Sequence, residues 1–156
     1  MELVPFVEED LLKVMEISQD SWTFQTTPSP FKTTDPEVFF KRLSKNTLLA
    51  KENGEVVGVL GWEEKYPFPT GSHVCELDIA VKKNQRQKGF GSKMLRLFFV
   101  RAKEMGLKKI SIRVLATNEK ALQMYKKVGF EVEGCLVKEF FINEQYVNDY
   151  QLAIFL

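Results

Sequence analysis

A short segment with two glycines carries the clearest chemical signal in the sequence. Residues 86–92 read Arg-Gln-Lys-Gly-Phe-Gly-Ser and join a predicted strand at 73–82 to a predicted long amphipathic helix. Gly89 and Gly91 permit a tight loop in which consecutive backbone N–H groups converge, and the start of the helix adds the positive end of its dipole. A loop of this kind suits a phosphate group.

Basic residues surround this glycine loop. The stretch 79–103 contains no acidic residue and eight basic ones, namely Lys82, Lys83, Arg86, Lys88, Lys93, Arg96, Arg101 and Lys103. The whole chain carries 22 Lys and Arg against 21 Asp and Glu, a net charge of +1, so this positive charge is local. Neither a G-x-x-x-x-G-K-[ST] loop nor a complete G-x-G-x-x-G motif occurs. On the loop alone, a solvated glycine-rich turn remains an alternative to a phosphate site.

The elements that position this loop alternate between strand and helix patterns. The predicted order is strand–helix–helix–strand–strand–strand–helix–strand–helix–strand–strand, which indicates an α/β domain on a mixed sheet. In chain order, the predicted elements are a strand at 2–7, helices at 8–19 and 35–45, a hairpin of strands at 47–52 and 55–64 around Asn53-Gly54, a strand at 73–82, a helix that ends at Gly106, a strand at 108–115, a helix at 118–128, and strands at 130–141 and 146–156.

Two motifs together resemble the GNAT superfamily of acyl-CoA N-acyltransferases. Residues 86–91 match the [QR]-x-x-G-x-[GA] loop of that family, and residues 118–130 resemble its N-x-x-A-x-x-x-Y-x-x-x-G-F helix. The resemblance is strong over 74–134, and the tail at 133–155 is similar to bacterial spermidine N-acetyltransferases and their relatives. It implies a single-domain GNAT-like fold over 1–156. In this fold a mixed central sheet is flanked by helices and splayed at an acyl-CoA cleft.

The resemblance also implies acetyl-CoA as the acyl donor and a set of residues that hold it. Strand backbone groups would pair with the pantetheine amides, loop amides would hold the pyrophosphate, and Arg86 and Lys88 would supply positive charge. Asn118 would cap its helix and contact the cofactor. The implied residues are Ile79, Ala80, Val81, Arg86, Gln87, Lys88, Gly89, Phe90, Gly91, Ser92 and Asn118. With one histidine and only two cysteines, Cys75 and Cys135, the sequence predicts no metal site.

Acyl transfer to an amine needs a proton for the departing thiolate, a base for the amine and an oxyanion donor. Tyr125 lies seven residues after Asn118 on the same helix face, so its hydroxyl could protonate the thiolate. Core packing is the alternative for this tyrosine. The base is expected to be Glu76, although a carboxylate facing solvent is an equal alternative there. A backbone N–H near Ile79 or Ala80 is the expected oxyanion donor.

Three other reactive residues receive structural interpretations. Asp78 shares a strand face with Glu76 but is expected to face solvent. His73 abuts a turn-rich loop and is expected to be a surface residue rather than a proton relay. Cys75 has no activating His–Asp arrangement apparent in the sequence, which favours direct attack by the amine over a covalent intermediate.

The sequence therefore predicts an N-acetyltransferase that moves an acetyl group from acetyl-CoA to a primary amine through a ternary complex. The alternatives are a non-catalytic acyl-CoA-binding sensor and, less favoured, a nucleic-acid module. Five acidic residues at 131–149 suggest a cationic acceptor, such as a polyamine-like small amine or a protein amino terminus; a solvated acidic face is equally open. Because no stretch reads as a signal peptide or membrane span, we expect a cytoplasmic protein without membrane or nucleic-acid partners. The sequence leaves the oligomeric state open, with a homodimer as one alternative.

Overall fold

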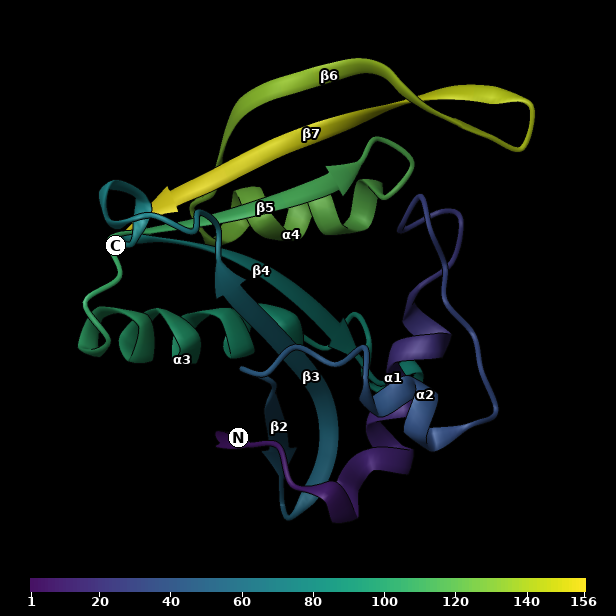
Figure 1. Cartoon of the computed structure of the whole chain (residues 1–156), viewed down its shortest axis with the longest axis vertical. Coiled ribbons are helices and arrows are strands. Elements are labelled where there is room, and N and C mark those ends of the chain that lie inside the picture. Colours follow the sequence, from purple (N-terminus) through teal and green to yellow (C-terminus); the bar gives the residue numbers. More distant parts are fainter.

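Seven strands form one mixed sheet in the computed structural model, which describes residues 1–156 (Figure 1). The strands are β1 (Glu2–Pro5), β2 (Leu48–Glu52), β3 (Glu55–Glu64), β4 (Val74–Val81), β5 (Lys109–Leu115), β6 (Glu131–Ile142) and β7 (Gln145–Phe155). Their order across the sheet is β1-β2-β3-β4-β5-β7-β6, and only the β4–β5 pair is parallel. The predicted order of elements and the mixed sheet are confirmed.

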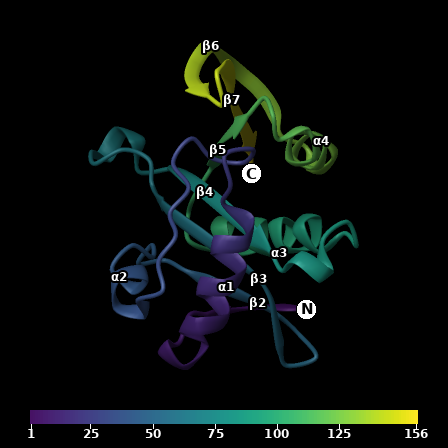
Figure 2. The same cartoon turned by 90° about the vertical axis from the view of Figure 1, so that its right-hand side faces the viewer.

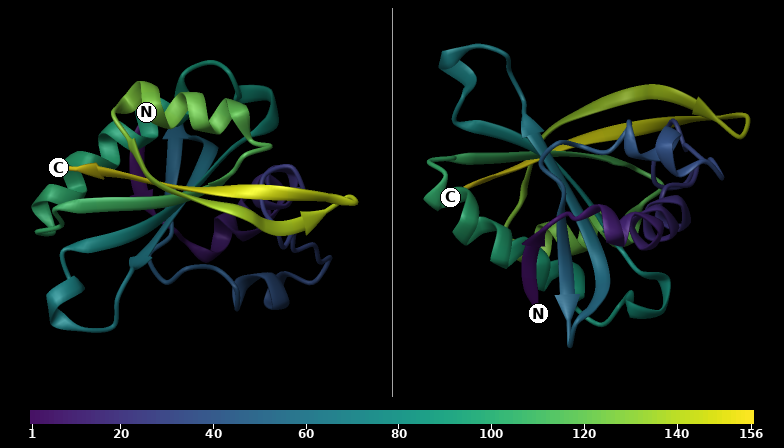
Figure 3. Two further views of the ribbon diagram at one scale, coloured as in Figure 1. Left: turned by 90° about the horizontal axis from the view of Figure 1, so that it is seen from above. Right: turned by 60° about the horizontal axis from the view of Figure 1, so that its bottom comes forward.

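Helices cover both faces of the sheet. They are α1 (Leu11–Ser21), α2 (Pro36–Phe40), α3 (Phe90–Glu104) and α4 (Glu119–Val128). Figures 2 and 3 show α3 and α4 on one side of the strands and α1 and α2 on the other. None of these helices combines the length and the apolar character needed to cross a membrane.

Several predicted boundaries differ from the structure. The first helix, predicted at 8–19, is a 3-10 turn at Glu8–Asp10 followed by α1, which ends at Ser21. The side chain of Asp35 accepts hydrogen bonds from the next turn and caps α2 as expected, but this helix ends at Phe40 rather than near Lys45. The N–H groups of Arg42 and Leu43 bond three residues back, which tightens the last turn into the loop before β2. Strand β1 ends at Pro5, two residues earlier than predicted.

Each face of the sheet has its own hydrophobic cluster. The larger cluster has 18 buried residues and packs α3 and α4 against the sheet. In α3, Leu95, Phe98 and Ala102 are fully buried, as their spacing predicts. The smaller cluster joins Val14 and Ile17 of α1 to the opposite face. The sheet is thus a layer packed between two sets of helices.

Strands β4 and β5 separate part-way along their length. Their parallel pairing comprises only Val74–Lys109, Cys75–Ile110 and Glu76–Ser111. Beyond these pairs the two strands diverge, which is visible in Figure 1 as β4 descends away from β5. The splayed sheet implied by the family resemblance is therefore present, and one edge of β4 is left without a strand partner.

Candidate active site

A cleft of about 720 Å³ occupies the split between β4 and β5. This volume lies in the range that holds small ligands and cofactors. Its walls come from β3, β4, β5, α4 and the loop after α1. The lining residues that bear on the predicted chemistry are Glu76, Asp78, Ile79, Val81, Asn118 and Tyr125.

Backbone groups of β4 face the cleft at alternate residues. On the β3 side, the N–H of Lys82 donates to the carbonyl of Val57, and the β3–β4 register continues antiparallel from there. Because alternate residues of such a ladder bond to the same neighbour, Ala80 directs both its backbone groups to β3. Ile79 and Val81 direct theirs to the split. They are thus placed to pair with an extended ligand, whereas the sequence-based expectation for Ala80 does not fit.

The glycine loop presents a row of free backbone donors. Gly89 has a φ of +81° and caps the start of α3. None of the N–H groups of residues 87–92 donates a hydrogen bond to another group of the protein. A Cβ on Gly91 would lie 2.6 Å from the sulfur of Met124, so this glycine lets α3 approach α4. The loop therefore offers up to six backbone N–H groups without a protein acceptor, the kind of group that binds an anion at a helix start.

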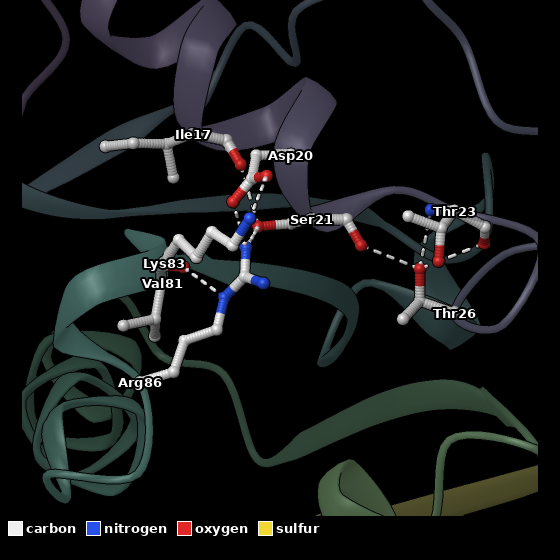
Figure 4. A network of polar contacts seen from close by, with 8 residues as sticks. All are labelled: Ile17, Asp20, Ser21, Thr23, Thr26, Val81, Lys83 and Arg86. Atoms are coloured by element: carbon white, nitrogen blue, oxygen red, sulfur yellow. Dashed lines mark hydrogen bonds and ion pairs between the residues drawn. The ribbon is translucent and has the colours of Figure 1, made fainter.

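Arg86 is tied to α1 instead of facing the loop amides (Figure 4). Its Nε donates to the carbonyl of Val81 at 2.9 Å, and Nη2 donates to Asp20 Oδ2 at 3.0 Å and to Ser21 Oγ at 2.9 Å. The loop therefore has an anchor at its start. Arg86 supports the loop's position and is not the free positive charge that the sequence suggested. Lys88 is exposed on the loop.

Tyr125 and Asn118 both reach the cleft from α4. The side chain of Asn118 accepts a hydrogen bond from the N–H of Ala121 at 3.4 Å, as predicted for a helix cap. Tyr125 is 5% exposed, and its ring packs edge-on against Phe130. Burial raises the pKa of the Tyr125 hydroxyl above its ordinary value, and the Asp78 carboxylate adds to this increase. The phenol is therefore a protonated donor at neutral pH.

Asp78 lines the cleft and is hydrogen-bonded there, whereas the sequence predicted a carboxylate that only faces solvent. Its Oδ1 accepts a hydrogen bond from the N–H of Gly61 at 3.1 Å. A Cβ on Gly61 would lie 2.8 Å from both carboxylate oxygens, so the missing side chain makes room for Asp78. The carboxylate meets solvent in the cleft, but the surrounding walls displace much of its water and raise its pKa; nearby Glu63 adds to this increase. Glu76 also lines the cleft, opposite Glu63 in the β3–β4 register.

The acidic tail does not form one side of the cleft. Of the five acidic residues at 131–149, only Asp149 lines it, and Asp149 is bound to Arg113 at 2.6 Å. The other four are exposed, with Glu139 near Arg113 and Glu133 paired with Lys109. The hypothesis of an acceptor field from this tail is wrong. The negative charge in the cleft comes from β3 and β4, at Glu63, Glu64, Glu76 and Asp78.

The remaining reactive residues lie away from the cleft lining. Cys75 is fully buried, and burial raises its pKa to about 11, which leaves a neutral thiol in the core. His73 is exposed next to the turn-rich loop, as expected. Neither of these residues supplies a nucleophile or a proton relay to the cleft.

Comparisons with known proteins identify the family. Residues 11–130 match the family model described as the acetyltransferase (GNAT) family. The chain belongs to this family. The split sheet, the glycine loop and the α4 motif of this GNAT chain are thus the parts of a shared acetyltransferase scaffold, and the roles assigned to single residues stay predictions.

Three relatives show how far the similarity of this GNAT chain extends. A spermidine N(1)-acetyltransferase of Escherichia coli (strain K12) is 37% identical over 86 residues, which are 52% of this chain and 44% of that protein. The L-amino acid N-acetyltransferase AaaT of the same strain is 32% identical over 107 residues, which are 68% of this chain and 65% of that protein. These matches span less than two thirds of either relative. The crystal structure of smu.2055 from Streptococcus mutans UA159 has 34% identity and a TM-score of 0.89, with 99% of both chains covered.

Proposed function

We propose that this protein is an N-acetyltransferase that moves an acetyl group from acetyl-CoA to a primary amine by direct attack in a ternary complex. The observation that carries the proposal is the split between β4 and β5, which brings a buried tyrosine hydroxyl and free strand amides to one cleft. Family membership supports the reaction class. The tail similarity and the acidic wall of the cleft support an amine as the acceptor.

The cofactor half of the proposal uses the unpaired backbone donors. The amides of residues 87–92 hold the pyrophosphate, with Gly89 allowing the turn. Ile79 and the N–H of Val81 pair with the pantetheine amides along the free edge of β4, as an added strand would, since the Val81 carbonyl already accepts from Arg86. Asn118 contacts the cofactor from the start of α4. Arg86 acts indirectly, since its guanidinium is bound to α1 and to the Val81 carbonyl.

The chemical half assigns one role to each group in the cleft. The amine nitrogen attacks the thioester carbonyl, so that a C–N bond forms and the C–S bond breaks. The N–H of Ile79 stabilises the oxyanion, and the Tyr125 hydroxyl protonates the departing thiolate. The proton of the amine passes to Glu76, which lines the cleft beside the acceptor space. Direct attack is favoured because the thiol of Cys75 is buried and neutral.

Thiol release from acetyl-CoA with a panel of amines tests the proposal, together with Tyr125→Phe and the control Tyr150→Phe. Tyr150 is half-buried on β7 and does not line the cleft. Tyr125→Phe lowers kcat on the order of a hundredfold, which is typical for loss of a general acid, and leaves the Kd of acetyl-CoA unchanged. Equal kcat for Tyr125→Phe and Tyr150→Phe would contradict the acid role. Tight acetyl-CoA binding without turnover of any amine would instead indicate the sensor.

The proposal also covers where the protein is located, how it assembles and which partners it lacks. A cytoplasmic location and the lack of nucleic-acid or membrane partners stay predictions of the sequence, and a homodimer stays one alternative for the assembly. Size-exclusion chromatography with light scattering checks the assembly. Binding measurements with RNA in excess CoA check the nucleic-acid alternative.

A further inference from the structure

A second pocket opens from the cleft on the side of α1 and α2. Its volume is about 360 Å³. The cleft and this side pocket share Trp22, Arg42, Ser44, Gly61 and Asp78. These five residues therefore form a junction between the cleft and the side pocket.

The interior of the side pocket is mainly apolar. Beyond the junction it is lined by Phe31, Phe39, Leu43, Val59 and Ala80. Its polar groups beyond the junction are the hydroxyls of Ser18 and Thr47, and the Thr47 hydroxyl already donates to the carbonyl of Ser44 at 2.7 Å. A pocket with this lining favours an apolar side chain over a charged chain, because burying an unpaired charge there is costly.

The junction carries two opposite charges that do not bond to each other. On one side, Asp78 is held by the N–H of Gly61. On the other side, the guanidinium of Arg42 lies 3.9 Å from the centre of the Phe31 ring. No carboxylate of the chain forms an ion pair with Arg42, whereas Arg113 in the same cleft is paired with Asp149. Arg42 is thus a stacked cation whose hydrogen-bonding fork is free for a carboxylate.

We propose that the acceptor is a free α-amino acid with an apolar side chain. Its amino group lies at Asp78, its carboxylate binds Arg42, and its side chain enters the side pocket. The inference rests on the proposed function, because the junction is the acceptor end of the same cleft. A polyamine satisfies Asp78 but brings a further positive charge to Arg42, and a peptide amino terminus lacks the free α-carboxylate.

Three amines with related structures test the carboxylate contact. L-leucine and L-leucinamide share the amine and the side chain but differ in the carboxylate, and leucyl-glycine stands for a peptide terminus. We expect kcat/KM for L-leucine to exceed that for L-leucinamide on the order of tenfold to a hundredfold, the contribution of a charge-assisted hydrogen-bonded pair. Arg42→Gln lowers kcat/KM for L-leucine and leaves that for L-leucinamide unchanged. Equal values for all three substrates in the wild type would overturn the inference.

A matched variant and a second substrate pair separate this contact from general effects. Lys65 also lines the cleft without an ion pair, and its amine donates to Ser111 Oγ at 2.7 Å. It does not line the side pocket. Lys65→Gln leaves the ratio of L-leucine to L-leucinamide unchanged. Leu43→Phe fills the side pocket and lowers kcat/KM for L-leucine more than for L-alanine. If the ratio of kcat/KM for L-leucine to kcat/KM for L-leucinamide is the same in Arg42→Gln as in Lys65→Gln, the role of Arg42 is overturned.

Binding without turnover distinguishes failure of the inference from failure of the proposed function. Calorimetry measures L-leucine binding to the protein saturated with CoA, in the wild type and in Arg42→Gln. Binding that is lost in Arg42→Gln supports the inference even if no acetylated product forms, in which case only the proposed function fails. Turnover of spermidine without binding or acetylation of L-leucine overturns the inference and leaves the proposed function standing.

Discussion

Replacing Arg86 by Gln tests whether the glycine loop is anchored through α1. The change removes hydrogen bonds of 2.9, 3.0 and 2.9 Å to Val81, Asp20 and Ser21. The Arg86 and Asp20 side chains are each 37% exposed, so water competes for these groups. We assign about 1 kcal/mol to the bond with the Val81 carbonyl and about 1 kcal/mol to the contacts with α1. The sum of about 2 kcal/mol corresponds to a Tm lower by roughly 4–8 °C for a chain of this length.

Two control variants isolate the anchor. Lys83 belongs to the same network, but its amine is 4.0 Å from Asp20 and its side chain is 80% exposed. Lys83→Gln should therefore change the free energy of unfolding by no more than about 0.5 kcal/mol, as an ordinary surface substitution does. Its Tm should stay close to that of the wild type. Arg86→Lys keeps the charge but loses the planar fork, so its Tm should fall between those of the wild type and Arg86→Gln. Calorimetric melting of all four proteins gives the comparison.

The affinity for acetyl-CoA separates an anchor from a direct phosphate contact. If Arg86 is an anchor, Arg86→Gln weakens the Kd and leaves its dependence on salt concentration unchanged, because no phosphate contact is lost. Calorimetric titration at low and high salt measures this dependence. A Tm equal to that of Lys83→Gln, together with a flatter salt dependence of the Kd, would refute the anchor.

Two further predictions concern the loop and the pH dependence of stability. Gly89→Asp should weaken acetyl-CoA binding by more than tenfold relative to Gly89→Asn, because Asn has the same shape and tolerates the positive φ without adding charge; equal calorimetric affinities would contradict the pyrophosphate site. Asp10 is buried and bound to Lys13 and Lys51, each at 2.8 Å, and these hydrogen bonds hold its pKa below the ordinary 3.8. Its stabilisation is fully present above about pH 4 and is lost as pH falls through the lowered pKa, so Asp10→Asn should lower Tm at pH 7, with a gap that begins to narrow below about pH 4. Melting curves that keep the same gap at pH 3 would exclude this ion pair as the cause.

Local patterns were sufficient to predict the elements of the fold. Asn53 and Gly54 both have positive φ, as the hairpin turn requires, and Gly106 and Gly129 have positive φ after the helices they end. These features depend on residues within one or two turns of each other. The end of α2 was predicted less well, because the chain there turns so that Leu43 packs against the smaller cluster. That contact joins segments far apart in the sequence.

The site was predictable only where a motif is continuous. The glycine loop and the Asn118–Tyr125 helix are each one segment, and the family motifs in them pointed to Asn118 and Tyr125, which line the cleft, and to the loop residues 86–92, which do not line it. The direction of Arg86 depends on Asp20, 66 residues away, and no local pattern carries that information. For the same reason the sequence left two interpretations of the acidic tail open. Its composition is visible in the sequence, but its ion pairs with Lys109 and Arg113 of β5 depend on how the strands align.

The β3–β4 register links the two halves of the proposed reaction. It places Gly61 opposite Asp78, and only a glycine at that position leaves room for the carboxylate. A slip of one residue would bring Leu60 or Trp62 opposite Asp78 and would turn the backbone groups of Ala80, rather than Ile79, toward the split. The position of the Asp78 carboxylate at the acceptor side and the free backbone groups of β4 at the cofactor side would then be lost together. One strand pairing therefore fixes both the free amides on the cofactor side and the negative charge on the acceptor side, and the two cannot vary independently.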